Sequence, residues 1–281
     1  MTNHVTASFN FIDHAFTGGP TQYVDLRTPM AGPDTRQTID ISVKDARGAS
    51  DLGLESSGFT LCRQPSKVTD FYDCADVMQT YYTECRSLAE ELTGAHTTFT
   101  FDHIIREPGH QFSGGGTDST LQKSGIQAGG GYINSVHMDY TDNSTWDKYL
   151  NVHGKRTPVG ATRVYALNFW RPLSDSVDDQ PLAVCDARTV QADDLQEVVI
   201  SGYGAKNYSW HDIGIETYSV STSDRQQWYY YPGMTPEDVL IIKSYDSEGV
   251  IGNTCPHASF AHPSPKGESR RSIELRVLCF C

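Results

Sequence analysis

The sequence predicts a mainly β protein, a jelly roll or another double-sheet fold, formed by a single domain. Segments with the apolar and polar alternation of strands recur along the chain, and turns such as Pro232-Gly233 separate them. No helical pattern recurs between these segments, which disfavours a parallel sheet with crossover helices. With 281 residues, of which 38% are hydrophobic, the chain can bury one sizeable core.

The first part of the chain, residues 1–69, is expected to be a strand-rich N-terminal extension. Alternation predicts strands over residues 22–26 and 38–43, and the turn-prone pair Arg47-Gly48 follows the second of them. The pattern favours an extension of the main fold over a separate domain.

Residues 70–95 show a different pattern, in which apolar residues recur at helical spacing. Asp70 or Asp73 can cap the N-terminus of the predicted helix, and Gly94 can end it. Residues 97–105 return to strand alternation, so the chain is expected to enter a sheet again.

The core of the fold is expected over residues 132–281. A strand leads into His137-Met138-Asp139, and a short helix is expected around residues 145–150. The further strands are predicted over residues 163–170, 182–188, 196–201, 216–221, 227–231, 239–245 and 272–280.

A polar, glycine-rich segment over residues 113–131 precedes this core. Its two glycine triplets match neither the GxxxxGK[ST] nor the GxGxxG pattern of phosphate-binding loops. The segment is interpreted either as a mobile loop beside a site or as an ordinary surface loop.

Charge and composition exclude several classes of partner. The net charge of −13, from 35 acidic and 22 basic residues, would repel a phosphate backbone, so we expect no nucleic-acid partner. We find no run of about 18 apolar residues and no basic-then-apolar N-terminus, so we expect neither a membrane partner nor a secretion signal. The seven cysteines form an odd set without a repeated CxxC pair, which predicts reduced thiols in a cytoplasmic protein.

The segment His137-Met138-Asp139 is the first candidate for a metal site. In an extended strand the first and third residues point the same way, so His137 and Asp139 can reach one metal ion. Two histidines and one carboxylate are the ligand set that leaves open positions on Fe(II) for oxygen and an organic co-substrate. His-x-Asp alone is a weak signal, because it arises by chance in many proteins.

Two further segments near the C-terminus complete this candidate site. His257, in a loop beside Pro256, is a plausible third ligand. Arg270 leads into the last predicted strand, and its guanidinium suits a carboxylate such as the distal one of 2-oxoglutarate. Ser272 can add a hydroxyl donor, and Arg276 is the alternative anchor because it shares the predicted strand face.

Aromatic residues near the ends of the predicted strands can line an apolar substrate pocket. The candidates are Tyr132, Tyr140, Trp170, Trp228, Tyr229 and Tyr230. Tyrosine and tryptophan are also ordinary packing residues of β-sandwiches, so a structural role is the alternative.

Short motifs beyond the candidate ligands resemble one family in collinear order. They are Val43-Lys44-Asp45-Ala46-Arg47-Gly48, Ser57-Gly58-Phe59, Gly94-Ala95, Phe101-Asp102-His103, Val136-His137-Met138-Asp139, Asn168-Phe169-Trp170-Arg171-Pro172-Leu173, Pro181-Leu182-Ala183-Val184-Cys185-Asp186-Ala187-Arg188, Cys255-Pro256-His257-Ala258-Ser259-Phe260 and Arg270-Arg271-Ser272-Ile273-Glu274-Leu275-Arg276. The chain thereby resembles the fungal gibberellin-desaturase and cephalosporin-methoxylase-like hydroxylase/desaturases, which are Fe(II)/2-oxoglutarate-dependent dioxygenases. The glycine-rich segment over residues 113–131 does not match this pattern closely.

The resemblance implies a double-stranded β-helix core, cupin-like, with flanking helices. It implies Fe(II) held by His137, Asp139 and His257, with 2-oxoglutarate and O2 as co-substrates and the arginine of the C-terminal RxS motif toward 2-oxoglutarate. The implied reaction is hydroxylation, desaturation or oxidative cyclisation, through a ferryl species, of a small-molecule intermediate of fungal secondary metabolism.

The resemblance also places Trp170, Arg171 and Arg188 near the site. A buried structural pairing, for instance of Arg171 or Arg188 with Asp186, explains the two arginines equally well. Their roles therefore stay open at this point.

Two other functions remain as alternatives. One is a non-enzymatic β-sandwich that binds a small molecule and holds a structural metal, and the other is a zinc-dependent hydrolase, although the chain has no HExxH motif. The sequence leaves the oligomeric state open, including a homodimer.

Overall fold

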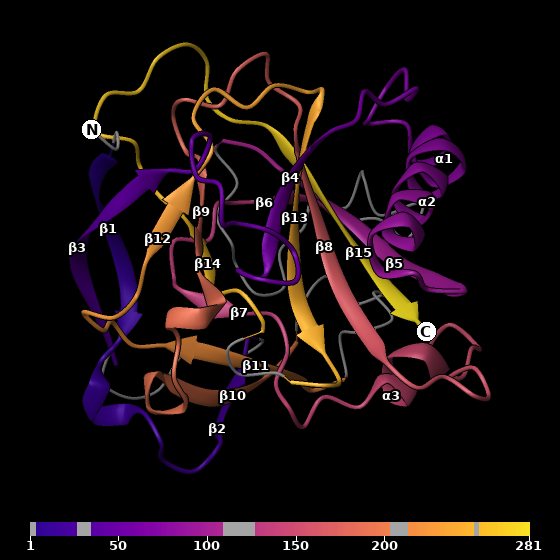
Figure 1. Cartoon of the computed structure of the whole chain (residues 1–281), viewed down its shortest axis with the longest axis horizontal. Helices are drawn as coiled ribbons and strands as arrows, with labels where there is room; N and C mark the ends of the chain where they lie inside the picture. The colour runs from indigo at the N-terminus through magenta and orange to yellow at the C-terminus, as the bar shows by residue number, and fades with distance from the viewer. Residues whose placement is uncertain (1–3, 27–34, 109–126, 203–212, 250–252) are drawn as a thin grey trace.

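Two β-sheets face each other in the computed structural model, which describes residues 4–26, 35–108, 127–202, 213–249 and 253–281, without the side chains of residues 101, 102 and 127–130. A helical segment covers the outer side of one sheet (Figure 1). The predicted mainly β fold class is confirmed.

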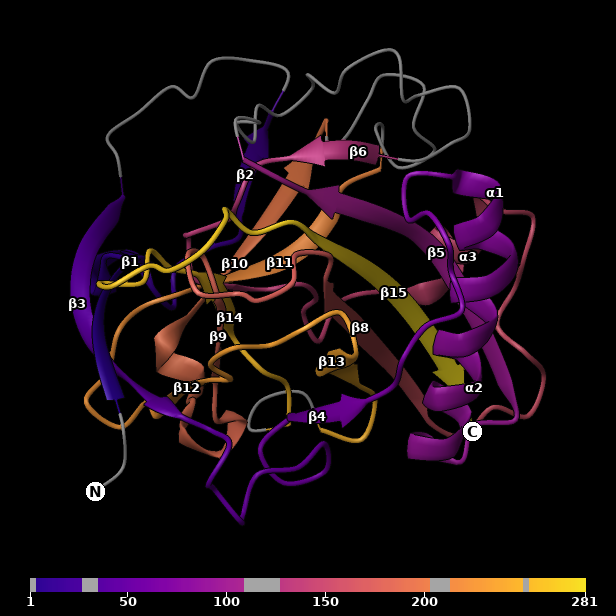
Figure 2. The same ribbon diagram turned by 90° about the horizontal axis from the view of Figure 1, so that it is seen from above.

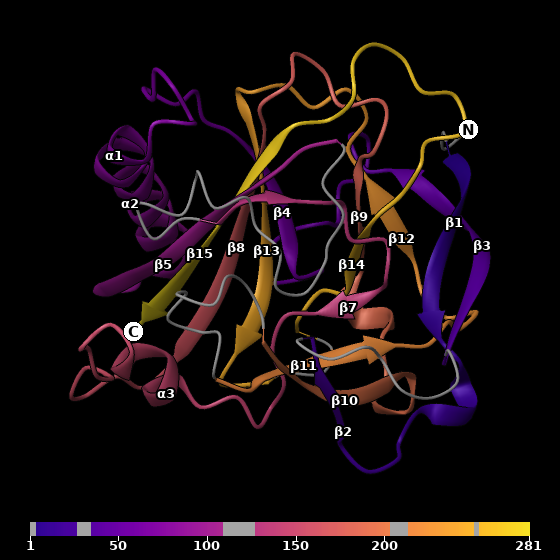
Figure 3. The ribbon, with the colours of Figure 1, turned by 180° about the vertical axis from the view of Figure 1, so that it is seen from behind.

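The larger sheet has nine strands in the order β1-β3-β12-β9-β14-β7-β11-β10-β2. Their bounds are His4–Ile12 for β1, Gln22–Asp25 for β2, Arg36–Asp45 for β3, His137–Met138 for β7, Leu182–Cys185 for β9, Leu195–Ser201 for β10, Ile215–Val220 for β11, Trp228–Tyr230 for β12 and His257–Ser259 for β14. Figure 3 shows the short β7 between β14 and β11, so the His-x-Asp segment lies at the centre of this sheet.

The smaller sheet has six strands in the order β4-β13-β8-β15-β5-β6. Their bounds are Phe59–Arg63 for β4, Thr97–Arg106 for β5, Gln127–Gly130 for β6, Val164–Pro172 for β8, Asp238–Asp246 for β13 and Ser272–Phe280 for β15. The central strand β8 is antiparallel to both of its neighbours, β13 and β15.

The predicted helix forms over α1 (Cys74–Asp76), a π-helical turn (Val77–Tyr81) and α2 (Tyr82–Thr93). Asp73 is the N-cap, because its carboxylate accepts hydrogen bonds from the backbone N–H groups of Ala75 and Asp76. Gly94 ends the helix in the left-handed region, with φ of 70°, as the sequence predicted.

This helix packs its apolar side on the outer face of the six-stranded sheet. Figure 2 shows the helix beside this sheet from above. In β8 the alternation of side chains sends Leu167 and Phe169 into that outer cluster, whereas Ala166 and Trp170 face the other sheet. Trp170 therefore lies between the two sheets. The second predicted helix is α3 (Trp146–Asn151).

The N-terminal segment does not stand apart as an extension. β1, β2 and β3 belong to the nine-stranded sheet, where β3 pairs with β12 in parallel, and β4 forms an edge of the six-stranded sheet. β5 also lies before residue 132, yet it pairs with β15 along most of its length. The core therefore draws on the chain from residue 4 onward, because strand pairing joins segments that are distant in sequence.

Several element boundaries differ from the prediction for local reasons. Strands β1 and β4 were not predicted as strands. The strand predicted over residues 182–188 ends at Cys185, because the Asp186 carboxylate accepts from the Arg188 N–H and caps a 3-10 turn over Ala187–Thr189. Most of the glycine-rich segment, residues 109–126, lies outside the described residues.

No helix among the described residues is long and apolar enough to cross a membrane.

Candidate metal centre

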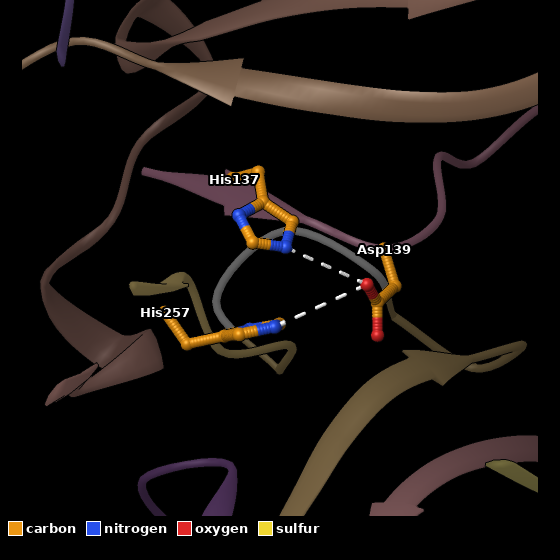
Figure 4. A group of neighbouring side chains, drawn as sticks. All are labelled: His137, Asp139 and His257. Carbon is orange, nitrogen blue, oxygen red and sulfur yellow. Dashed lines mark ion pairs between the residues drawn. The ribbon is translucent and has the colours of Figure 1, made fainter. Parts of the chain in front are cut away.

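His137, Asp139 and His257 come together between the two sheets. His137 begins β7 and His257 begins β14, and the two residues are directly paired across these strands. The Asp139 Oδ1 atom lies 3.7 Å from His137 Nε2 and 4.0 Å from His257 Nε2. Figure 4 shows both imidazoles turned toward this carboxylate. His257 is on a short strand and not in the loop that the sequence predicted, and this pairing fixes its position beside His137.

Backbone carbonyl groups hold both rings in one tautomer. His137 Nδ1 lies 2.8 Å from the Ser135 carbonyl oxygen, and His257 Nδ1 lies 3.2 Å from that of Cys255. Because a carbonyl oxygen only accepts, each Nδ1 carries a proton, and in the neutral form of each ring the lone pair is therefore on Nε2, which faces the site. This is the usual arrangement of a metal-binding histidine with its second ring nitrogen fixed.

Burial and neighbouring charges favour the ligand forms of these groups. Burial, together with the nearby His257, lowers the pKa of His137 to about 4, so its ring is neutral at pH 7. Burial opposes ionisation of Asp139, but Arg276 and the two histidines more than offset it and hold the pKa of Asp139 below its usual range. The neutral ring of His137 and the ionised carboxylate of Asp139 are therefore in the forms that bind a cation.

The donor set fits a divalent transition metal. The three ligand atoms lie within 4.8 Å of one another, so one ion can contact all of them. Two imidazole nitrogens and one carboxylate oxygen on one side of an ion form the facial arrangement of non-heme Fe(II) sites. The three residues therefore fit an iron centre with open positions.

The second oxygen of Asp139 has its own partners. Oδ2 accepts from the Ser244 hydroxyl at 3.2 Å and from the Asn168 amide at 3.4 Å, and it lies 3.8 Å from Arg276 Nε. All three residues come from the inner face of the six-stranded sheet, so the carboxylate bridges the two sheets.

Arg270 is a buried guanidinium beside this group. Nη1 donates to the Gln180 carbonyl oxygen and, at 3.0 Å, to the Ser259 hydroxyl, and Nε has no hydrogen-bond partner. No carboxylate of the described residues pairs with it. Burial lowers the pKa of Arg270 to about 9, so it is still charged at neutral pH. A buried charge without a counter-ion is costly, which indicates a site for an anion.

Two of the predicted pocket residues surround Arg270. The Tyr132 ring centre lies 4.3 Å from the guanidinium carbon, and the Tyr132 hydroxyl donates to the Arg270 carbonyl oxygen at 2.6 Å. The Trp170 ring centre lies 5.4 Å away. Ser272 begins β15 nearby, and its buried hydroxyl has no partner among the described residues. The structure thus gathers Tyr132, Trp170, Arg270 and Ser272.

Arg276, unlike Arg270, contacts carboxylates of the protein. Its Nη2 donates to Glu274 Oε1 at 3.0 Å, while Arg106 holds the same Glu274 carboxylate with two hydrogen bonds of 2.8 Å. Burial opposes ionisation of Glu274, but Arg106 and Arg276 lower its pKa to about 2. Arg276 therefore stands between two carboxylates, those of Asp139 and Glu274.

Three predicted pocket residues lie elsewhere. Tyr140 packs in an apolar cluster, with its ring centre 4.8 Å from that of Trp146. Arg171 faces the helix, where its guanidinium carbon lies 5.2 Å from the Tyr81 ring centre, because its place in β8 puts it on the outer face. Arg188 is at the surface and pairs with Asp186, the structural alternative stated above.

Comparisons with known proteins agree with this geometry. A family model described as an oxidoreductase/YMDC permease-like domain matches residues 9–280. The hydroxylase/desaturase efuI of Hormonema carpetanum is 30% identical over 98% of this chain and 95% of its own. The Fe(II)/2-oxoglutarate-dependent dioxygenase nvfI of Aspergillus novofumigatus is 31% identical over 84% of this chain and 81% of its own. The chain belongs to the hydroxylase/desaturase family of Fe(II)/2-oxoglutarate-dependent oxygenases.

Solved structures extend this result to the fold. The oxygenase matches the iron and alpha-ketoglutarate-dependent endoperoxidase NvfI with a TM-score of 0.75 and 25% identity, over 99% of this chain and 98% of that chain. The predicted jelly-roll fold is confirmed. The oxygenase is an oxidoreductase that uses Fe(II), 2-oxoglutarate and O2, and its substrate is a small molecule.

Four contributors to this region were not predicted, namely Arg106, Asn168, Ser244 and Ser259. Alternation could have found Asn168, because it shares the inner face of β8 with Trp170. Arg106 lies one residue beyond the predicted end of its strand. Alternation also puts Ser244 on the inner face of its strand, with Leu240 and Ile242, but it does not reveal the bulge at this residue.

Proposed function

We propose that His137, Asp139 and His257 hold the Fe(II) of this oxygenase and that Arg270, with Ser272, holds the distal carboxylate of 2-oxoglutarate. The observation that carries the proposal is the buried guanidinium of Arg270 without a carboxylate partner among the described residues. Ser259, which contacts Arg270, lies two residues after His257 on β14. Two strand residues span about 7 Å, which is the scale of a five-carbon diacid.

Arg270 is better suited to this role than Arg276. Arg276 already lies between Asp139 and Glu274, so binding a further carboxylate would require it to leave these partners. The planar fork of Arg270 keeps one N–H unused, and the unpartnered Ser272 hydroxyl can donate to the same group. Tyr132 and Trp170 flank the guanidinium and restrict its movement.

Bound iron with 2-oxoglutarate and O2 supplies an oxidant that can remove a hydrogen atom from an unactivated C–H bond. The protein's residues fix the geometry in which this happens. His137, His257 and Asp139 would hold the ion, Arg270 would orient the co-substrate, and the apolar side chains of the inner faces exclude water. The position of the substrate carbon then selects among hydroxylation, desaturation and oxidative cyclisation.

A small molecule of fungal secondary metabolism is the proposed substrate class. Support comes from the relatives, which include a protein named for aspirochlorine biosynthesis in Aspergillus oryzae, 35% identical over 42% of this chain. We further propose that residues 1–281 act as one oxygenase domain in the cytoplasm. A homodimer is the alternative to a monomer, and analytical ultracentrifugation separates the two.

Anaerobic titration of the apoprotein with Fe(II) and 2-oxoglutarate tests the site. Wild type should develop the visible charge-transfer band of the chelate. Arg270→Gln should bind 2-oxoglutarate about 10- to 100-fold more weakly, because a charge-assisted pair is lost. The control Arg225→Gln removes a surface arginine that pairs with Asp193 and Asp194, and it should titrate like wild type. A missing band in wild type would contradict the iron site, and an unchanged Arg270→Gln would contradict the anchor.

The alternatives predict a different dependence. A zinc hydrolase would turn over without O2 and 2-oxoglutarate, and a binding protein with a structural metal would produce no succinate. Membership of the oxygenase family supports neither the zinc hydrolase nor the binding protein.

A further inference from the structure

We propose that Ser244 and Asn168 are positioning residues, which hold one oxygen of Asp139 and keep the other turned to the metal as a single ligand atom. The proposal rests on the metal-binding role proposed above for His137, Asp139 and His257. It concerns how the carboxylate binds, whereas the proposed function concerns which residues bind.

The two oxygens of Asp139 face different surroundings. Oδ1 points to the Nε2 atoms of both histidines, at 3.7 and 4.0 Å. Oδ2 points away from them and accepts hydrogen bonds from Ser244 and Asn168. Because both donors lie on the opposite sheet and are almost fully buried, they restrain rotation of the carboxylate about its Cβ–Cγ bond.

Ser244 lies at a β-bulge and shares the inner face of β13 with Leu240 and Ile242. Lys243 pairs with Leu167 and Tyr245 with Ala166, so Ser244 is the extra residue of β13 and has no partner on β8. Lys243 lies over the Tyr165 ring on the helix side, whereas Tyr245 packs in the inner cluster with Trp146. The bulge therefore lets two consecutive residues, Ser244 and Tyr245, point inward, which regular alternation would not allow.

Asn168 is placed by regular pairing in the middle of the sheet. It lies between Ile242 of β13 and Arg276 of β15. A carboxylate only accepts hydrogen bonds, so the Asn168 amide must turn its NH2 group to Asp139. The Asn168 side chain is 3% exposed, and this contact is the one hydrogen bond that its amide makes among the described residues.

One-oxygen binding matters for the reaction. Three single ligand atoms from the protein would leave positions on the ion open for 2-oxoglutarate and O2. If Asp139 rotated and bound through both oxygens, one of these positions would be lost. Ser244 and Asn168 therefore preserve the number of open positions.

Binding of Mn(II), counted from the EPR signal of the free ion, tests the proposal without turnover. Ser244→Ala and Asn168→Leu should each raise the Kd for Mn(II) about 10-fold, the lower end of the effect of losing a residue that orients a metal ligand. With saturating Mn(II), both variants should also bind 2-oxoglutarate more weakly. Ser244→Thr keeps the hydroxyl and should restore most of both affinities.

Ser221→Ala is the matched control. Ser221 is buried like Ser244, but its hydroxyl donates a hydrogen bond to the Asp194 carbonyl oxygen and not to a candidate metal ligand. It should leave both affinities unchanged. Variants that lower the melting temperature but keep wild-type affinities would overturn the positioning role. His137→Ala separates the two proposals. If this variant binds Mn(II) like wild type, the proposed metal site is wrong. If it loses Mn(II) binding while Ser244→Ala and Asn168→Leu keep the wild-type affinity, only the positioning role is rejected.

Discussion

At the scale of single residues, the site depends on groups whose protonation is set by burial. Backbone carbonyl groups hold the Nδ1 protons of His137 and His257, so the tautomer that they favour has its lone pair on Nε2. The sequence predicted these ligands and Arg270 from their types and order. It did not decide between Arg270 and Arg276, because both share the predicted strand face and only their contacts differ.

A buried histidine outside the site makes stability depend on pH. Burial lowers the pKa of His103 from 6.5 to about 4, and its Nδ1 lies 3.1 Å from the Tyr82 hydroxyl. The unfolded chain takes up a proton near pH 6.5 and the folded chain does not, so stability is full above pH 6.5 and is lost as the pH falls toward 4.

We expect His103→Gln to remove this contribution. When the pH is lowered from 7 to 5, the unfolding free energy of the apoprotein should fall by about 2 kcal/mol less in the variant than in wild type. Urea titration at each pH measures this free energy. His96→Gln changes an exposed histidine and should keep the wild-type slope. Equal slopes for wild type and His103→Gln would contradict a neutral buried His103.

At the scale of elements, local signals set the helix and pairing set the strands. The helix over residues 74–93 was predictable because its end residues interact with backbone close to them in sequence: Asp73 caps the first turn, and Gly94 adopts the left-handed conformation after the last turn. The bulge at Ser244 was not, because it is defined by the register of β13 against β8. The same holds for the strand at His257, whose three residues are strand only through their partners.

Gly94→Ala should destabilise the protein by about 1 kcal/mol, because Gly94 has φ of 70° and an L-residue is strained there. Gly48→Ala is the control, since neither site has any atom within 4 Å of the added Cβ but Gly48 has no positive φ. Urea unfolding should show no loss for the control. A similar loss in both variants would mean that the conformation of Gly94 is not the cause.

At the scale of the whole molecule, charged side chains alternate across the space between the sheets. The series begins at the candidate metal ligand Asp139 and ends on β5, and its members in order are Asp139, Arg276, Glu274 and Arg106. Arg106 also donates to the Gly131 carbonyl oxygen, which links this series to the segment before β7. Apolar clusters lie on either side of it, so the series is a buried polar layer in an otherwise apolar interior.

Glu274→Gln should cost about 3 kcal/mol of unfolding free energy, because it leaves the buried charges of Arg106 and Arg276 without their shared carboxylate. Glu237→Gln breaks a surface pair with Arg63 and should cost less than about 1 kcal/mol. Circular dichroism and tryptophan fluorescence should report the same single transition if the chain is one domain. Equal losses in the two variants would contradict the importance of burial.

The sequence by itself determined the mainly β class, the helix and its end at Gly94, the three candidate metal ligands and the family resemblance, because these depend on residue type, spacing and order. Only the tertiary structure decided that the N-terminal strands belong to the core, that Arg171 and Arg188 lie outside the site, and that Ser244 and Asn168 hold Asp139. The physical reason is that register, sheet face and desolvation arise from contacts between distant segments, and a single sequence does not specify which of the compatible contacts form.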